Sequence, residues 1–105
     1  MSELVKLIEE CKVDDIANIL QIRNDIKYNK MKSSEEFQEL ALALTQQVLK
    51  PIKVKDQEII DEIGDCIIRL SILTKIYDLD KIRERLNYKV TTFNKYLLKR
   101  KPLPY

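Results

Sequence analysis

The segment from residue 56 to residue 68 carries five acidic side chains and no basic one. The five are Asp56, Glu58, Asp61, Glu62 and Asp65. With about 100° of rotation per helical residue, Glu58, Glu62 and Asp65 stack on one face, where each like-charged pair costs about 0.2–0.5 kcal/mol. The helix that would carry them turns apolar on nearly all sides in its second half, so the acidic face points toward packed protein. Carboxylates held together in such a place usually have a cation between them.

A second acidic pair, Glu36 and Glu39, lies one helical turn apart beside an apolar stripe. If its helix packs antiparallel to the first through the short connection at residues 50–55, this pair faces Glu62 and Asp65. Four carboxylates without a nitrogen or sulfur ligand suit a hard cation, Mg²⁺ or alternatively Mn²⁺. Taken singly, each cluster also has an ordinary interpretation, as first-turn partners of a helix dipole or as a solvated face.

Other chemistries are excluded by composition. The 105 residues include no histidine, which removes Ser-His-Asp and Cys-His nucleophile pairs and imidazole metal ligands. Cys11 and Cys66 both lie inside apolar-periodic segments, and we expect two small buried thiols in a reducing compartment rather than a disulfide or a metal pair.

The length of the chain and its net charge limit the number of domains and the kinds of partner. A chain of this length makes one domain, residues 1–105. The net charge of +2 provides no broad basic surface, so we expect no polymeric nucleic acid partner. The acidic N-terminus is unlike a signal peptide, and no apolar stretch approaches about 18 residues, so we expect a cytoplasmic protein without a membrane partner.

The chain is expected to be all-α, an antiparallel bundle of about five helices, because its apolar residues recur at three and four positions instead of alternating. Ser2 can cap a first short helix, and a second continues the period after a break near residues 12–15. Residues 29–34 are polar and predict a connection, after which Ser33 or Ser34 caps a third helix that Pro51 ends.

The second half of the chain predicts two further helices. The longest helix of the protein should begin at Asp56 and run to about Tyr77. A corner at residues 78–80 follows, and Asp80 can cap a last helix from Lys81 to about Leu98. Residues 99–105 predict a short basic tail.

The order of these motifs resembles a known family. The run "EEFQEL" at residues 35–40, a turn containing lysines, and "EIIDEIGDCIIRLSILTKIYDLD" at residues 58–80 resemble the all-α nucleotide pyrophosphohydrolases of the MazG-like superfamily. The hallmark of that family is Glu-x-x-Glu followed, after a helical hairpin, by Glu-x-x-Asp. The matching residues are Glu36, Glu39, Glu62 and Asp65, and the resemblance spans about residues 33–98.

The resemblance implies an activity. The four carboxylates would bind Mg²⁺, which holds the phosphates of a nucleoside triphosphate while water attacks the α–β linkage, giving a monophosphate and pyrophosphate. A bound metal can acidify its water and polarise phosphoryl oxygens, so no histidine is required. Glu35 or Glu58 could orient the water or accept its proton.

Relatives in this family carry a Lys on the last helix and an Asn one turn later, and both contact the substrate. Lys89 matches the first, whereas Phe93 stands where the Asn is expected. Arg69 occupies a position that is often apolar, from which it could reach a phosphate or pair with Asp65 or Glu62. Gly64, the only glycine, would cost about 1 kcal/mol inside a helix, and we expect close approach of another helix to explain it.

Two other functions stay open from the sequence: a phosphoribosyl-ATP pyrophosphohydrolase-like enzyme, and a helical regulatory or interaction protein that kept the fold without turnover. Apolar residues on both sides of the helix at residues 59–76 exceed what neighbouring short helices can cover. We therefore expect the core to be completed by a homodimer or homotetramer, with Lys89 or Arg69 of one subunit over the other subunit's metal site.

Overall fold

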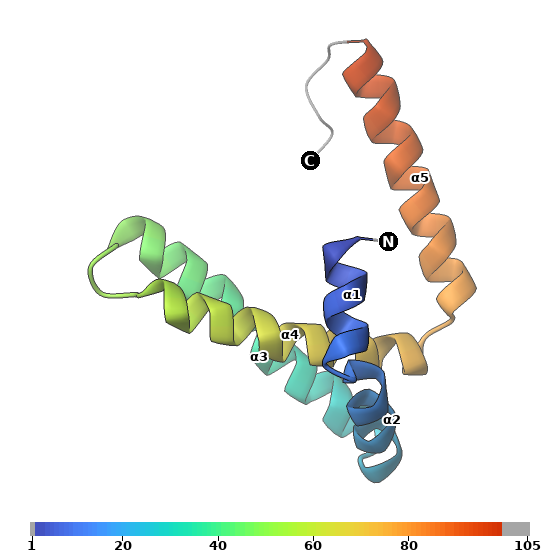
Figure 1. Cartoon of the computed structure of the whole chain (residues 1–105), viewed down its shortest axis with the longest axis horizontal. Coiled ribbons are helices and arrows are strands. Elements are labelled where there is room, and N and C mark those ends of the chain that lie inside the picture. Colours follow the sequence, from blue (N-terminus) through green and yellow to red (C-terminus); the bar gives the residue numbers. More distant parts are fainter. Residues whose placement is uncertain (1, 100–105) are drawn as a thin grey trace.

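The computed structural model describes residues 2–99, which form five α-helices (Figure 1). The first two are α1 (Glu3–Glu10) and α2 (Val13–Arg23). The Ser2 hydroxyl accepts a hydrogen bond of 3.2 Å from the Val5 amide, which confirms the predicted cap of α1. Lys12, with φ of 54°, makes the break between the two helices. The all-helical class with five helices is therefore as expected, whereas the expected tail lies outside the described residues, apart from Lys99.

The third helix, α3 (Ile26–Leu49), begins well before the position predicted for it. The Asp25 carboxylate caps it by accepting a hydrogen bond of 2.7 Å from the Tyr28 amide. The predicted connection at residues 29–34, and the predicted caps Ser33 and Ser34, were wrong. Two polar residues in this stretch are buried within the fold: Asn29 and Ser33 have exposures of 1% and 2%.

The fourth and fifth helices are α4 (Asp56–Ile76) and α5 (Leu79–Leu98). The predicted start of α4 is confirmed, but α3 with 24 residues, not α4 with 21, is the longest helix. The predicted cap Asp80 was also wrong. The Asp78 carboxylate accepts hydrogen bonds from the Asp80 and Lys81 amides, and α5 begins at Leu79.

The core lies where α2 and α3 pack on α4. The α3–α4 hairpin is closed by Gln47, whose amide donates to the Val54 carbonyl at 3.3 Å and to the Asp56 carboxylate at 2.8 Å. On the other side of α4, Lys75 pairs with Asp14 of α2. The buried apolar side chains of the described residues are few: Val13, Ala17, Val54, Cys66 and Ile72.

Packing within a single chain covers only part of α4. Ile72 is completely buried, and Ile68 and Ile76 are half-buried. The N-terminal helices, α2 in particular, account for part of this cover, while Ile60 and Leu70 remain 57% and 54% exposed.

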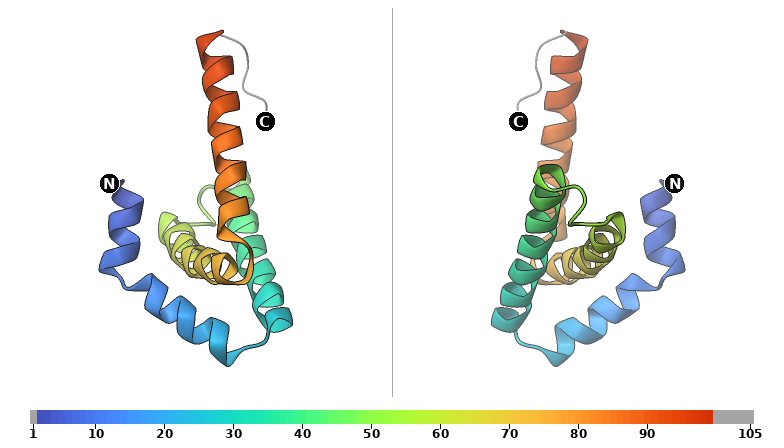
Figure 2. Two further views of the ribbon diagram at one scale, coloured as in Figure 1. Left: turned by 90° about the vertical axis from the view of Figure 1, so that its right-hand side faces the viewer. Right: turned by 90° about the vertical axis from the view of Figure 1, so that its left-hand side faces the viewer.

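The fifth helix extends away from the rest of the molecule as a separate arm (Figures 1 and 2). It touches the other helices mainly at its first turns, where Lys81, Ile82 and Arg85 line a cavity with the end of α4. The radius of gyration of 16.5 Å accordingly exceeds the roughly 13 Å expected for a compact chain of about 100 residues. No residue of α5 is buried.

Candidate metal centre

The predicted carboxylates meet at the interface of α3 and α4. Glu36 and Glu39 lie one turn apart in α3, and Glu62 and Asp65 lie one turn apart in α4. Glu36, Glu62 and Asp65 each offer a carboxylate oxygen within 4.8 Å of the other two. Glu39 is outside that group of three, but its charge helps to raise the pKa of the Glu62 carboxyl. The antiparallel hairpin thus brings the four together.

Two oxygens of this cluster are buried without a hydrogen-bond partner. The Glu36 side chain is only 14% exposed, and its Oε1 lies 3.4 Å from the Lys32 ammonium. Its Oε2 is buried and has no partner, and the same is true of Glu62 Oε2. Buried polar atoms are nearly always satisfied in folded proteins, and these two oxygens are not.

The carboxylates of the cluster lie close enough to affect one another's charge. Partial burial, and then the charges of Glu39, Asp65 and Glu36, raise the pKa of the Glu62 carboxyl above its ordinary value. A cation in the cluster would oppose each of these effects.

Cys66 anchors the cluster on α4. Its thiol is buried and donates a hydrogen bond of 3.4 Å to the Glu36 carbonyl oxygen, which fixes α4 against α3 at this level. Burial, followed by the surrounding carboxylates, raises the pKa of the Cys66 thiol, so it stays protonated near neutral pH. The expectation of two buried thiols was half wrong, since Cys11 is exposed at the end of α1.

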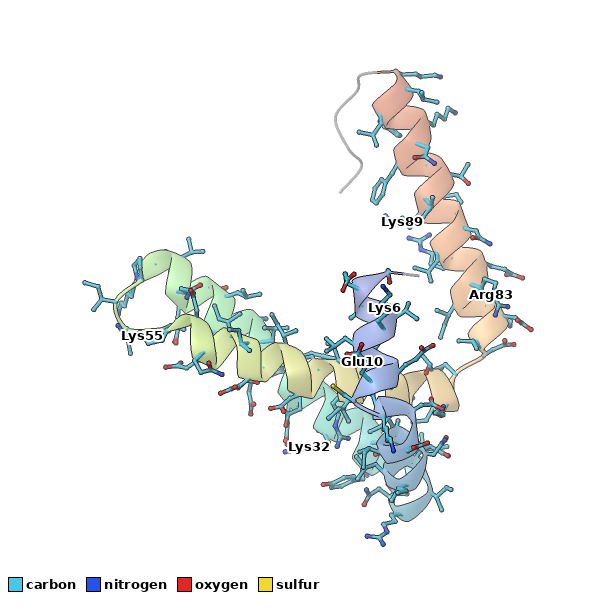
Figure 3. The ribbon with its side chains drawn as sticks, viewed as in Figure 1. Lys6, Glu10, Lys32, Lys55, Arg83 and Lys89 are labelled. Carbon is cyan, nitrogen blue, oxygen red and sulfur yellow. The ribbon has the colours of Figure 1, made fainter. Side chains whose placement is uncertain are left out.

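Lys32 is the residue that the sequence interpretation missed. Its ammonium lies 3.3 Å from Glu35 and 3.4 Å from Glu36, and hydrogen bonds to these two carboxylates raise the pKa of Lys32. The spacings of three and four residues were visible in the sequence. The sequence pattern predicts a connection at residues 29–34, and this prediction hides the pairing. Lys32 lies within α3 (Figure 3).

Arg69 of α4 is buried at 9% exposure, and its Nη1 has no hydrogen-bond partner. The alternative of an ion pair with Asp65 or Glu62 is not realised, because the ion pairs of the described residues do not include Arg69. It lines a cavity together with Glu36 and Asp65. A guanidinium therefore lies beside the carboxylates without being neutralised by them.

The two candidates for handling water are at the edge of the cluster. Glu35 precedes Glu36 in mid-helix, not in a first turn; its side chain is 59% exposed and pairs with Lys32. Glu58 is exposed and lies one turn before Glu62 on α4. Neither belongs to the group of three oxygens that lie within 4.8 Å of one another.

Lys89 lies apart from the cluster. It is on α5, where its ammonium stacks over the Phe93 ring at 5.4 Å, and Figure 3 shows it on the arm away from α3 and α4. A single chain does not bring Lys89 to the carboxylates.

Gly64 has an open environment. A Cβ at this position would meet no atom within 4 Å, so the expected close approach of another helix was wrong. The glycine lines a cavity of about 360 Å³ between α1 and α4, which Cys11 and Asp65 also line.

Together these features define an all-helical protein with a partly buried carboxylate cluster on a helical hairpin. No family model, curated protein or solved structure matches the chain. Within residues 2–99, none of the helices has the length and apolar character needed to span a membrane.

Proposed function

We propose that the protein is a Mg²⁺-dependent nucleoside triphosphate pyrophosphohydrolase that cleaves the α–β phosphate linkage, giving a nucleoside monophosphate and pyrophosphate. The observation that carries the proposal is the meeting of Glu36, Glu62 and Asp65, with buried oxygens of Glu36 and Glu62 left unpartnered. Glu39 adds a fourth carboxylate. These are the residues on which the resemblance to the MazG-like superfamily rests.

The donor set fits Mg²⁺. All the donors are carboxylate oxygens, which Mg²⁺ and Mn²⁺ prefer. Three of them already lie within 4.8 Å of one another, so the same side chains could hold one cation. Lys32 offsets part of the negative charge at Glu36, but Glu62 keeps a raised pKa. The cluster thus retains an electrostatic requirement for a cation.

In this proposal Glu36, Glu39, Glu62 and Asp65 hold the cation. When bound, Mg²⁺ supplies positive charge against the phosphates and acidifies water. Glu35 and Glu58 are the candidates that orient the attacking water or accept its proton, because each flanks the cluster without belonging to its group of three close oxygens. Comparing Glu35→Gln with Glu58→Gln assigns this role to one of them.

The exposed arm suggests an assembly. Three residues of its apolar stripe, Leu86, Val90 and Leu97, are 56–61% exposed. Most of the stability of a helix in a protein comes from packing of its apolar face, so α5 needs a surface on which to pack. We propose a homodimer or homotetramer in which α5 packs on another copy, which would also bring Lys89 of one subunit toward the other's cluster.

The test is direct. The purified protein is incubated with a panel of nucleoside triphosphates and phosphoribosyl-ATP, with Mg²⁺ or with a chelator, and the products are separated by anion exchange. We expect equal amounts of monophosphate and pyrophosphate, only with the metal. Cleavage of phosphoribosyl-ATP alone would favour that related enzyme. Absence of turnover on the whole panel would favour a regulatory or interaction protein.

A further inference from the structure

A small cavity adjoins the carboxylate cluster on the side of α2. Its volume is about 230 Å³, and it is lined by Ile16, Leu20, Glu36, Asp65, Ile68 and Arg69. Two of the proposed metal ligands therefore form part of its wall. Apolar side chains of α2 and α4 form most of the rest of its wall.

Arg69 is the basic residue of this cavity. Its side chain is nine-tenths buried and its Nη1 has no hydrogen-bond partner. A guanidinium stays charged at all ordinary pH values, so burial cannot be relieved by loss of a proton. An unsatisfied charged donor in a shielded place is costly unless a ligand supplies the acceptor.

The acceptor that fits is an oxygen of an anion bound beside the cluster. Glu36 and Asp65 make no ion pair with Arg69, and their oxygens point into a group suited to a cation. A cation site next to a buried guanidinium recognises a ligand with several negatively charged oxygens, because different oxygens can face the two positive groups. Phosphate chains have this chemistry, and arginine matches their geometry.

We propose that Arg69 is a phosphate-binding residue, donating through its free Nη1 to a phosphate oxygen of the substrate in the α2–α4 cavity. The inference rests on the proposed function and deepens it. It assigns to this chain's own α4 the phosphate contact that the resemblance places on the last helix, where Lys89 is remote from the cluster.

The experiment measures binding rather than turnover. Inorganic pyrophosphate is titrated calorimetrically into the full-length protein in the presence of Mg²⁺, for the parent, Arg69→Met and Arg69→Lys. Arg83→Met is the matched control, because Arg83 lies on α5 and pairs with Asp80 away from the cluster. A titration with Mg²⁺ alone shows that each variant keeps the cation site.

We expect Arg69→Met to weaken pyrophosphate binding by at least about tenfold, the effect of losing a charge-assisted hydrogen bond. The pyrophosphate affinity of Arg69→Lys should lie between those of Arg69→Met and the parent, since lysine keeps the charge but lacks the planar donor group. Arg83→Met should bind as the parent does. If Arg69→Met fails to fold, Arg69→Lys alone decides by whether its affinity falls.

Unchanged pyrophosphate affinity in a folded Arg69 variant that still binds Mg²⁺ would overturn the inference, and Arg69 would then serve only to balance charge beside the carboxylates. Failure of this inference can be distinguished from failure of the proposed function. Arg69-dependent pyrophosphate binding without turnover supports the inference and rejects the hydrolase. Turnover together with unchanged pyrophosphate binding in the Arg69 variants supports the hydrolase and rejects the inference.

Discussion

The α3–α4 hairpin and the α5 arm differ in what they bury, although both expose apolar side chains, among them Val48 and Leu49 of the hairpin at 80% and 72%. The hairpin encloses polar groups: Asn29, Ser33 and Arg69 are buried, and Glu36 is nearly so. The arm exposes apolar groups, with Leu86 and Leu97 about 60% exposed. A folded monomer normally buries the second kind and exposes the first. Each region therefore indicates a component that the single chain does not supply.

The two missing components differ in chemistry. In the proposals above, a cation satisfies the unpartnered carboxylate oxygens of the hairpin and a phosphate satisfies Nη1 of Arg69. An apolar stripe on a helix that packs on little else calls for a protein surface. Substitutions in the carboxylate cluster should therefore alter chemistry and leave assembly intact, while substitutions in the apolar stripe of the arm should alter assembly.

The largest effect is expected from removing a carboxylate of the cluster. Glu39→Gln or Asp65→Asn should lower kcat more than about a hundredfold, because several kcal/mol of charge stabilisation depend on the cation and each 1.36 kcal/mol is tenfold in rate. Without metal, the Tm should be unchanged or slightly higher, since like-charge repulsion is relieved. Steady-state kinetics and thermal unfolding measure the two effects.

Glu84→Gln, which neutralises an exposed acid of the arm, is the control and should keep full activity. Mg²⁺ should raise the Tm of the parent and of this control through binding to the folded state. It should not raise the Tm of the cluster variants. Retained activity in either Glu39→Gln or Asp65→Asn would reject the metal assignment.

The next effect concerns the arm. Light scattering at micromolar concentration should give the parent a mass of two or four chains, and Leu86→Glu should shift it toward one chain because a charge enters the apolar stripe. Thr91→Glu adds the same charge on the opposite side of α5 and should keep the parent's mass. A parent of one chain would reject the assembly, leaving the arm uncovered.

Spacing alone predicted the cluster, because Glu36 and Glu39, and Glu62 and Asp65, each lie three residues apart on helices joined by a short connection. Where the buried face is polar, the same reasoning failed. Asn29 and Ser33 point inward from the first turns of α3, so the apolar period that marks a helix is absent there. Buried polar residues in a helix can thus mimic the composition of a loop.

The surroundings of Arg69 and Gly64 could not be predicted from the sequence, for a different reason. Both are set by how α1 and α2 cross α4, which no local pattern encodes. Arg69 shares its cavity with Ile16 and Leu20 of α2. Gly64 is open because α1 leaves space beside it.

A smaller effect is expected at Gly64. Gly64→Ala should stabilise the protein by about 0.5–1 kcal/mol, because alanine favours the helix and its Cβ meets nothing within 4 Å. For a domain of this size the Tm should rise by a few degrees. Asn94→Ala, which raises helix propensity in the exposed arm, is the comparison and should raise the Tm less if α5 unfolds apart from the hairpin. A lower Tm for Gly64→Ala would show that the space beside α4 is filled.

The smallest effect is the pH dependence that Glu62 gives to the metal-free protein. Its pKa is raised in the folded state above the ordinary 4.5, so folding favours the protonated carboxyl. This contribution to stability is complete below about pH 4.5 and is lost as the pH rises through the folded pKa. Glu62→Gln should therefore flatten the fall of Tm between pH 4.5 and neutral pH, measured by thermal unfolding with a chelator. Glu84→Gln on the arm should keep the slope of the parent, and equal slopes for both variants would show that the hairpin does not crowd Glu62 with charge.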